Sequence, residues 1–214
     1  MRADTATTVC LCFVGDNGES AIVWHIDDEV AVLPENVRAA ESAIERADAV
    51  VMTFEVPVPA MRETISSAGR CGARVIVQPA PMMAEAAVGG SLPWDHVDVL
   101  VPNEIEARAL LDGSADLGAD LLAGELSRKL SVPDVVVTLG ESGCVAHADG
   151  MSRLYPAPRA VAVDTTGASD AFTAVCAANL VAGVPLADAI HAAQTAAAVA
   201  IGRPGGHESM PSSF

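Results

Sequence analysis

The sequence predicts an α/β fold in which helices cover both faces of a central, mostly parallel sheet, with a β-hairpin at the start of the chain. Two observations predict it. From residue 35 onward, short apolar runs typical of buried strands alternate with amphipathic helical runs. Before that point, two strand-like runs are joined by a Gly/Asp/Asn turn. We expect one domain over residues 1–214, with a hairpin in 1–30 and the core in 31–214.

The hairpin is predicted from residues 8–14 and 20–26, which are rich in strand-forming residues. The sequence GDNG at 15–18 joins them. Gly, Asp and Asn tolerate the backbone conformations that tight hairpin turns require. An antiparallel pair of strands is therefore expected here.

The core is predicted from strands and helices that alternate along the chain. Parallel strands need crossover connections, and helices of 10 to 15 residues supply them. The predicted order is helix 35–47, strand 49–54, helix 58–68, strand 74–78, strand 97–101, helices 104–111 and 117–130, and strand 135–138.

The pattern changes after residue 138. Strands 135–139 and 144–148 surround a tight turn, and 151–156 is expected to pair next to them. The last third is helical, in Ala-rich segments 171–182 and 186–201. Gly183 is typical of the end of the first helix, and Pro185 of the start of the second.

Composition excludes several classes of partner. The 214 residues contain 12 Lys and Arg against 28 Asp and Glu, a net charge of −16. No basic stripe is present, so nucleic-acid binding is not expected. No apolar run reaches the eighteen residues of a membrane-spanning helix. No secretory h-region precedes Cys10, so we expect a cytoplasmic protein.

The most informative motif is DTTGASD at 164–170, which leads directly into an apolar helix. Small residues before a helix leave its free N–H groups open to an anion of the size of a phosphate. A carboxylate at the rim, Asp170, is well placed to take a proton from an attacking hydroxyl. On the local pattern alone, a simple helix cap by Ser169 or Asp170 is equally consistent.

A second motif, PNEIEA at 102–107, follows a predicted parallel strand. Ligands commonly bind at the carboxyl edge of such strands, where Glu106 could order a hydrated Mg²⁺. Asn103 and Glu106 also form a capping-box pattern, and taken alone the motif favours the cap.

A third motif, TLGESG at 138–143, places glycines after a strand. Such glycines admit phosphate or ribose, but they also form ordinary hairpins. No GxxxxGK[ST] loop is present, and no GxGxxG follows an opening strand, which argues against a nicotinamide-binding domain.

The order of the three motifs is more specific than any one of them. NxxE after a strand, TLGxxG after a strand, and DTxGxxD before an apolar helix together resemble the ribokinase-like (pfkB) carbohydrate kinase family. The resemblance runs from about Thr8 to the C-terminus. It includes FEVP at 54–57, VQPAP at 77–81 and GRPG at 202–205.

That resemblance implies ATP- and Mg²⁺-dependent phosphorylation of a sugar or nucleoside hydroxyl. By position, Asp170 is the base, Glu55 faces the sugar and Glu106 lies near Mg²⁺. The other implied roles are an anion hole from Gly167, Ala168 and Ser169, nucleotide contacts from Asn103, Thr138, Gly140, Gly143 and Gln194, and a monovalent cation such as K⁺ at Asp164, Thr166, Gly205 and Ser209.

Two departures from the family pattern qualify this hypothesis. Ser169 stands where the family usually has Gly before the catalytic Asp, and its side chain crowds the phosphoryl position. The family's N-terminal portion, with its Gly-Gly sugar motif and most of its lid, has no counterpart before Met1, so residues 1–30 correspond to a lid-like remnant. We expect an incomplete sheet edge that a homodimer or a partner chain covers. A nucleotide-binding remnant with weak or no catalysis is the alternative function.

Overall fold

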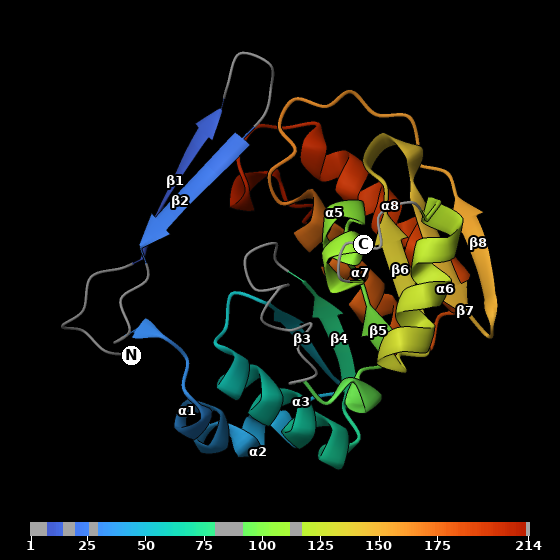
Figure 1. Ribbon diagram of the computed structural model, residues 1–214. Coiled ribbons are helices and arrows are strands. Elements are labelled where there is room, and N and C mark those ends of the chain that lie inside the picture. Colours follow the sequence, from blue (N-terminus) through green and yellow to red (C-terminus); the bar gives the residue numbers. More distant parts are fainter. Residues whose placement is uncertain (1–7, 15–19, 26–29, 80–91, 112–116, 213–214) are drawn as a thin grey trace.

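The hairpin and the core form separate sheets in the computed structural model, which describes residues 8–14, 20–25, 30–79, 92–111 and 117–212. Strands β1 (Val9–Val14) and β2 (Ser20–His25) pair antiparallel as a two-stranded sheet, with Leu11 opposite Val23. Figure 1 shows this hairpin beside the body of the molecule. The hairpin prediction is confirmed, while its turn at 15–18 and Ile26 lie outside the described residues.

The central sheet has six strands in chain order, β3-β4-β5-β6-β7-β8. The pairs from β3 to β6 are parallel, and β7 and β8 add antiparallel strands at one side. The mostly parallel sheet is therefore confirmed. Its strands are β3 (Ala49–Thr53), β4 (Arg74–Gln78), β5 (Val99–Leu100), β6 (Asp134–Thr138), β7 (Cys144–Ala148) and β8 (Met151–Tyr155).

Strand β5 is shorter than the predicted 97–101. A 3-10 turn, η2 (Trp94–His96), runs directly up to Val97, which delays the start of the strand. At the other end Val101 still donates a backbone hydrogen bond to Val77, at 2.8 Å. The central position of β5 in the sheet is unchanged by this shortening.

The helices follow the predicted order. They are α1 (Pro34–Ala39), α2 (Glu41–Ile44), α3 (Val58–Cys71), α5 (Glu104–Leu110), α6 (Ala119–Leu130), α7 (Ala168–Val181) and α8 (Leu186–Ile201). None of the helices in the described ranges is both long and apolar enough to cross a bilayer.

Two helix boundaries differ from the prediction. The single helix expected over 35–47 breaks at Ala40, whose φ of −94° and ψ of 3° leave the helical region. Helix α7 begins at Ala168 instead of residue 171. The apolar pattern marks only where the helix becomes buried, whereas the small polar residues before it already form its first turn. This earlier start places Asp170 in the first turn of α7.

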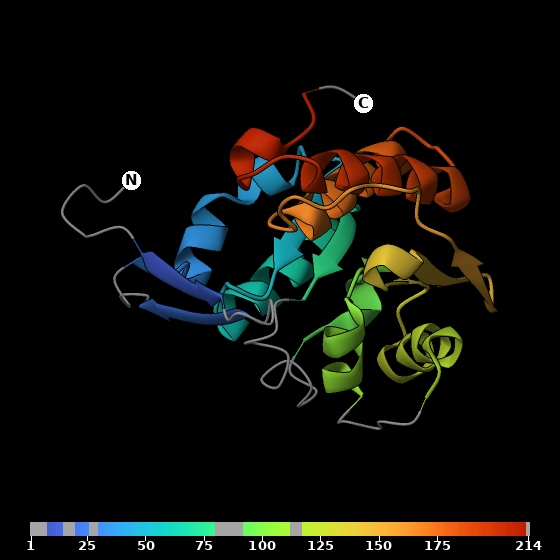
Figure 2. The same cartoon turned by 90° about the horizontal axis from the view of Figure 1, so that it is seen from above.

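Each face of the sheet packs against its own set of helices. One cluster joins Val75 and Val77 of β4 to buried residues of α3, α5 and α6. The other joins Ile76 of the same strand to α7 and α8. This alternation along β4 is the period-2 pattern of a strand buried on both faces. Figure 2 shows α7 and α8 on the opposite side of the sheet from α5 and α6, which confirms helices on both faces.

Substitution of Gly143 by alanine is predicted to destabilise the fold more than the same change at Gly150. Both glycines have positive φ, 98° and 75°, so both variants are strained. A Cβ on Gly143 would also collide with the Tyr155 carbonyl and lie 2.6 Å from the Ala157 nitrogen, whereas nothing lies within 4 Å of one on Gly150. We expect losses of about 3 kcal/mol for Gly143→Ala and about 1 kcal/mol for Gly150→Ala. Urea unfolding measures both, and equal losses would contradict the packing argument.

Candidate functional site

Polar side chains gather where the four parallel strands end. Glu55 follows β3, Gln78 is the last residue of β4, Asn103 follows β5, and Thr138 is the last residue of β6. Parallel strands bring their carboxyl ends to one edge, where ligands of α/β folds bind. Asn103 and Thr138 form a β-bridge there, and the Thr138 amide donates to the Pro102 carbonyl at 2.9 Å. Two of the predicted motifs are thus neighbours.

The N-terminus of α7 lies at the same edge. The side-chain amide of Gln78 donates a hydrogen bond from Nε2 to Oδ1 of Asp170, at 3.3 Å. Asp170 is exposed and does not pack inward. Gly167, the N-cap residue, has a φ of 78°, a left-handed conformation that favours glycine. The motif at 164–170 therefore joins the motifs at 102–107 and 138–143 at one edge of the sheet.

The first turn of α7 leaves backbone amides open. The Ala168 amide donates to the Thr165 carbonyl at 3.2 Å, so it is already engaged. The amides of Gly167, Ser169 and Asp170 have no acceptor within the described part of the chain. Two of the three amides predicted for an anion hole are therefore free, and that of Asp170 adds a third. Free amides at a helix N-terminus favour an anion.

Met210 closes one side of this turn. A Cβ on Gly167 would lie 2.5 Å from the Met210 methyl carbon and 3.7 Å from the Gly206 backbone. The side chains of Ser169 and Asp170 are exposed. The turn is therefore packed on the Gly167 side and open to solvent on the side of the proposed base.

The residues predicted for a monovalent cation come together in one loop cluster. Asp164 accepts hydrogen bonds from the amides of Thr166 and Gly205, both at 2.9 Å, through different carboxylate oxygens. These backbone N–H groups hold the pKa of Asp164 below its usual value. The buried Ser209 hydroxyl donates to the Gly206 carbonyl at 2.8 Å. The cluster joins the turn before α7 to the segment after α8, and its role in binding a cation stays a prediction.

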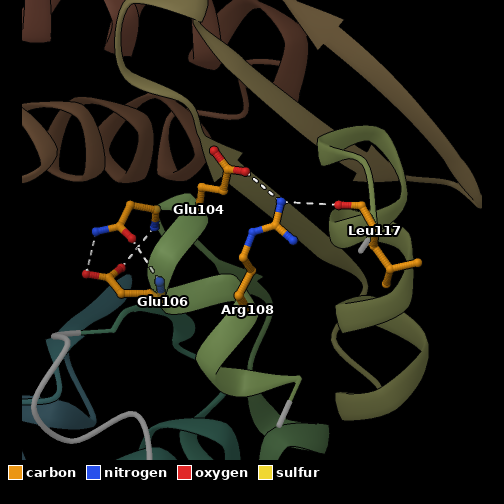
Figure 3. Close-up of polar contacts among 5 residues, drawn as sticks. Glu104, Glu106, Arg108 and Leu117 are labelled. Atoms are coloured by element: carbon orange, nitrogen blue, oxygen red, sulfur yellow. Dashed lines mark hydrogen bonds and ion pairs between the residues drawn. The ribbon is translucent and has the colours of Figure 1, made fainter. Parts of the chain in front are cut away.

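Asn103 and Glu106 form a complete capping box at the start of α5 (Figure 3). The Glu106 amide donates to Asn103 Oδ1 at 2.8 Å. In return, the Asn103 backbone and side-chain nitrogens donate to the two Glu106 oxygens, each at 2.9 Å. The cap interpretation of this motif is confirmed, and the Mg²⁺ role of Glu106 stays a prediction.

Burial changes the acidity of Glu106. Only 6% of its surface is exposed. Loss of solvation raises its pKa to about 7, and the hydrogen bond from the Asn103 backbone opposes part of that rise. The outer face of the same helix is solvated, where Glu104 pairs with Arg108 at 2.7 Å and Arg108 donates to the Leu117 carbonyl at 3.2 Å (Figure 3).

A divalent cation would depend on more than protein ligands. The described residues include no group of three or more His, Cys, Asp or Glu side chains that could hold a metal ion. Mg²⁺ usually keeps several waters and binds through one or two carboxylates together with substrate phosphates. The described residues therefore do not form a metal cage of their own, and a Mg²⁺ site would need ligands from a bound nucleotide.

The glycines of the TLGESG motif at 138–143 form part of a tight turn. They surround a 3-10 turn, η3 (Gly140–Ser142), and the Gly143 carbonyl accepts from the Leu139 amide at 2.8 Å. Gly140 has a φ of 58° and is exposed. Gly143 lies against the backbone that follows β8. Their contacts with a nucleotide stay a prediction.

Gln194 lies in the interior, 7% exposed. Its Nε2 donates to the Tyr155 carbonyl at 2.8 Å and lies 3.7 Å from Cys144 Sγ. This amide links α8 to the end of β8. These hydrogen bonds do not test its predicted contact with the nucleotide base. Such a contact would have to use the side-chain Oε1, which is not involved in these bonds, or a rotated side chain.

Gln78 lies in the motif at 77–81, but the sequence alone assigned it no role. Ala80 and Pro81 of that motif lie outside the described residues. A polar residue at the end of a buried strand, directly before Pro79, is the signal that points to it. The Thr173 hydroxyl, one turn after Asp170, was also missed. It is buried without a hydrogen-bond partner among the described residues.

A family model for pfkB family carbohydrate kinases matches residues 1–213. The chain therefore belongs to the pfkB carbohydrate kinase family. It is 31% identical to the ribokinase of Schizosaccharomyces pombe over 217 aligned residues, covering 97% of this chain and 65% of that protein. The chain thus spans just under two thirds of this relative's length.

Solved structures show the same fold. The ribokinase of Giardia lamblia superposes with a TM-score of 0.81 at 24% identity, over 96% of this chain and 69% of that one. The ribokinase of Arabidopsis thaliana, solved with ribose and ATP, superposes with a TM-score of 0.74 at 23% identity, over 94% and 65% of the two chains. The predicted ribokinase-like fold is confirmed.

Burial of Glu106 predicts a pH-dependent stability. Between its usual pKa near 4.5 and about 7, the folded chain keeps a proton that the unfolded chain has released. The free energy of unfolding should therefore fall as pH rises through this window, by about 2 kcal/mol between pH 5 and pH 7. Glu106→Gln should remove that slope, as measured by urea unfolding at a series of pH values.

The matched control for that measurement is Glu104→Gln, a change at a half-buried position in the same first turn of α5. It should keep the wild-type slope. If Glu106→Gln and wild type show the same pH dependence, Glu106 does not hold a proton in the folded state near neutral pH.

Proposed function

We propose that this chain acts as an ATP- and Mg²⁺-dependent kinase that phosphorylates a hydroxyl of a sugar or nucleoside. The observation that carries the proposal is the exposed Asp170 beside free amides of the first turn of α7, at the edge where the parallel strands end. Membership of the pfkB family supports the sugar-kinase class. The relative solved with ribose and ATP supports both types of ligand.

In the proposed reaction Asp170 accepts the proton of the acceptor hydroxyl as that oxygen attacks. The amides of Gly167 and Ser169 donate hydrogen bonds to the oxygens of the transferred phosphoryl group, where negative charge must be stabilised. ATP supplies that phosphoryl group, whose bond to the β-phosphate oxygen breaks so that ADP leaves. The two functions sit within one helix turn, so the backbone of α7 sets the distance between base and anion hole.

The remaining predicted residues are assigned by their place at the same edge. Asn103, Thr138 and Gly140 would face the nucleotide, and Glu106 would hold water of a phosphate-bound Mg²⁺. Glu55, exposed after β3, would contact the sugar. The loop cluster of Asp164, Thr166, Gly205 and Ser209 would hold K⁺ through its remaining oxygens.

A second function, nucleotide binding without turnover, is favoured by one observation. Ser169 is exposed directly before Asp170. Because a side chain in the first turn of a helix leans toward the helix N-terminus, its hydroxymethyl group is expected to share the space in front of the free amides. Assays of ADP release with a panel of sugars and nucleosides, together with thermal unfolding in the presence of ATP, separate the two functions. Release of ADP with one acceptor supports the kinase, and stabilisation by ATP without any release supports the binding protein.

Asp170→Asn should abolish phosphorylation and spare the affinity for ATP. Loss of a general base lowers kcat by about 10² to 10⁴, while the free amides of the helix turn remain in place. Asp188→Asn, the same change in the exposed first turn of α8, is the matched control. Steady-state kinetics and calorimetric ATP titration measure the two quantities. Unchanged turnover in Asp170→Asn would remove this carboxylate from the mechanism.

The hairpin carries an apolar face that a second copy of the chain would cover. Val9, Leu11, Phe13 and Val23 point to one side of the β1–β2 ribbon and are 54–59% exposed. Isolated two-stranded ribbons are marginally stable in water, so burial of this face would stabilise them. The proposed assembly is a homodimer, and the division into a hairpin and a core stays a prediction.

The double variant Leu11→Asp, Phe13→Asp should therefore be monomeric where the unmodified chain is dimeric, because two buried charges would oppose association. Light scattering after size-exclusion chromatography gives the mass. The control is Val161→Asp, in an exposed loop outside the hairpin, where the residue is 83% exposed. A monomeric unmodified chain would overturn the dimer.

A further inference from the structure

Gln78 makes a contact that connects the central sheet to the proposed base. It is the last residue of β4, half-buried, and lies opposite Thr53 of β3 in the parallel register. Its Nε2 donates to Oδ1 of Asp170 at 3.3 Å, across 92 positions of sequence. This is the one hydrogen bond to the Asp170 side chain found within the described residues.

We propose that Gln78 is a positioning residue that orients the Asp170 carboxylate for proton transfer, an inference that rests on the proposed role of Asp170 as base. A carboxylate in the first turn of a helix is attracted to the free amides of its own N-terminus. Rotation toward them would place it where the phosphoryl group must bind. The hydrogen bond from Gln78 instead holds Oδ1 toward the sheet edge.

The bond leaves the second carboxylate oxygen of Asp170 without a partner among the described residues. A carboxylate oxygen that is held in place and unpaired can accept a proton from an incoming hydroxyl. A distance of 3.3 Å is at the long end for a hydrogen bond, as expected for catalytic contacts in a structure without ligands. Gln78 thus fixes one oxygen and leaves the other to react.

The chemical type of the donor also fits this role. A Lys or Arg at this place would hold Asp170 in a charged pair and would itself attract the phosphate. The carboxamide of glutamine donates a hydrogen bond without a charge of its own. It can therefore orient Asp170 without attracting the negatively charged phosphate by a charge of its own.

Two substitutions test the contact by kinetics. Gln78→Met keeps the length of the side chain without the donor, and Gln78→Asn keeps the donor on a chain shorter by one carbon. Both should lower kcat about tenfold, the effect of one lost hydrogen bond, with KM for ATP changed less than twofold. A rise in KM at unchanged kcat would overturn the positioning role.

The matched control is Asn179→Leu, which removes a carboxamide from the same helix as Asp170. The Asn179 amide donates to the Val175 carbonyl at 2.9 Å, two turns or more from the proposed base. This variant should keep the wild-type kcat. An equal loss in this control and in Gln78→Met would show a general effect on α7 and overturn the inference.

A second measurement does not depend on turnover. Gln78 and Gln194 are the two glutamines of the chain, so the side-chain amide signals of Gln78 in a ¹⁵N–¹H spectrum are assigned by their loss in Gln78→Met. Asp170→Asn should shift these signals and leave those of Gln194 in place. Unshifted Gln78 signals overturn the inference whether or not the chain has activity.

The experiments distinguish a failure of the proposed kinase function from a failure of the proposed role of Gln78. A wild-type chain without turnover on any acceptor overturns the proposed function, and the amide signals then decide the contact of Gln78 with Asp170 by themselves. Turnover in the wild type with an unchanged kcat in Gln78→Met leaves the kinase in place and overturns the positioning role.

Discussion

The carboxylate of Asp164 is the constraint on which the proposed site depends. One oxygen accepts from Thr166 in the turn before α7, and the other accepts from Gly205 after α8. The two segments are thereby held together, and backbone bonds from residues 163 and 164 to the Ile201 carbonyl reinforce the link. Because the turn is fixed, α7 begins in a defined place, and its Asp170 reaches Gln78 at the carboxyl edge of the sheet. The low pKa of Asp164 follows from the same two amides.

The sheet supplies the other half of the arrangement. Four parallel strands end at one edge, and each contributes a polar residue there without interrupting the apolar core below. Burial beside the core affects the acidity of Glu106. This residue completes the cap of α5, yet burial raises its pKa to about 7, so this side chain is about half protonated at pH 7. A cation or a positively charged ligand at this edge would favour the charged form.

Local patterns predicted the elements well and the side-chain contacts poorly. Residues 186–201 were predicted as a helix with the observed limits, since Pro185 and Gly202 mark its ends. The break at Ala40 and the early start of α7 carry no comparable sequence signal. The contacts of Gln78 and Gln194 join residues 92 and 39 positions apart, so no local window contains both partners. The capping box of Asn103 and Glu106 was predictable because its partners are three residues apart.

The side chain of Ser169 does not by itself exclude an anion from the N-terminus of α7. A side chain at the second position of a helix leans toward the helix N-terminus, so the Ser169 hydroxymethyl group lies on the side where an anion would bind. Substitution of Gly by Ser leaves the backbone N–H in place, and the amides of Gly167, Ser169 and Asp170 remain without acceptors in the described chain. The hydroxyl adds a donor to the same space. Anion binding is therefore compatible with Ser169, and whether the chain transfers a phosphoryl group depends on how precisely the acceptor hydroxyl is held against Asp170.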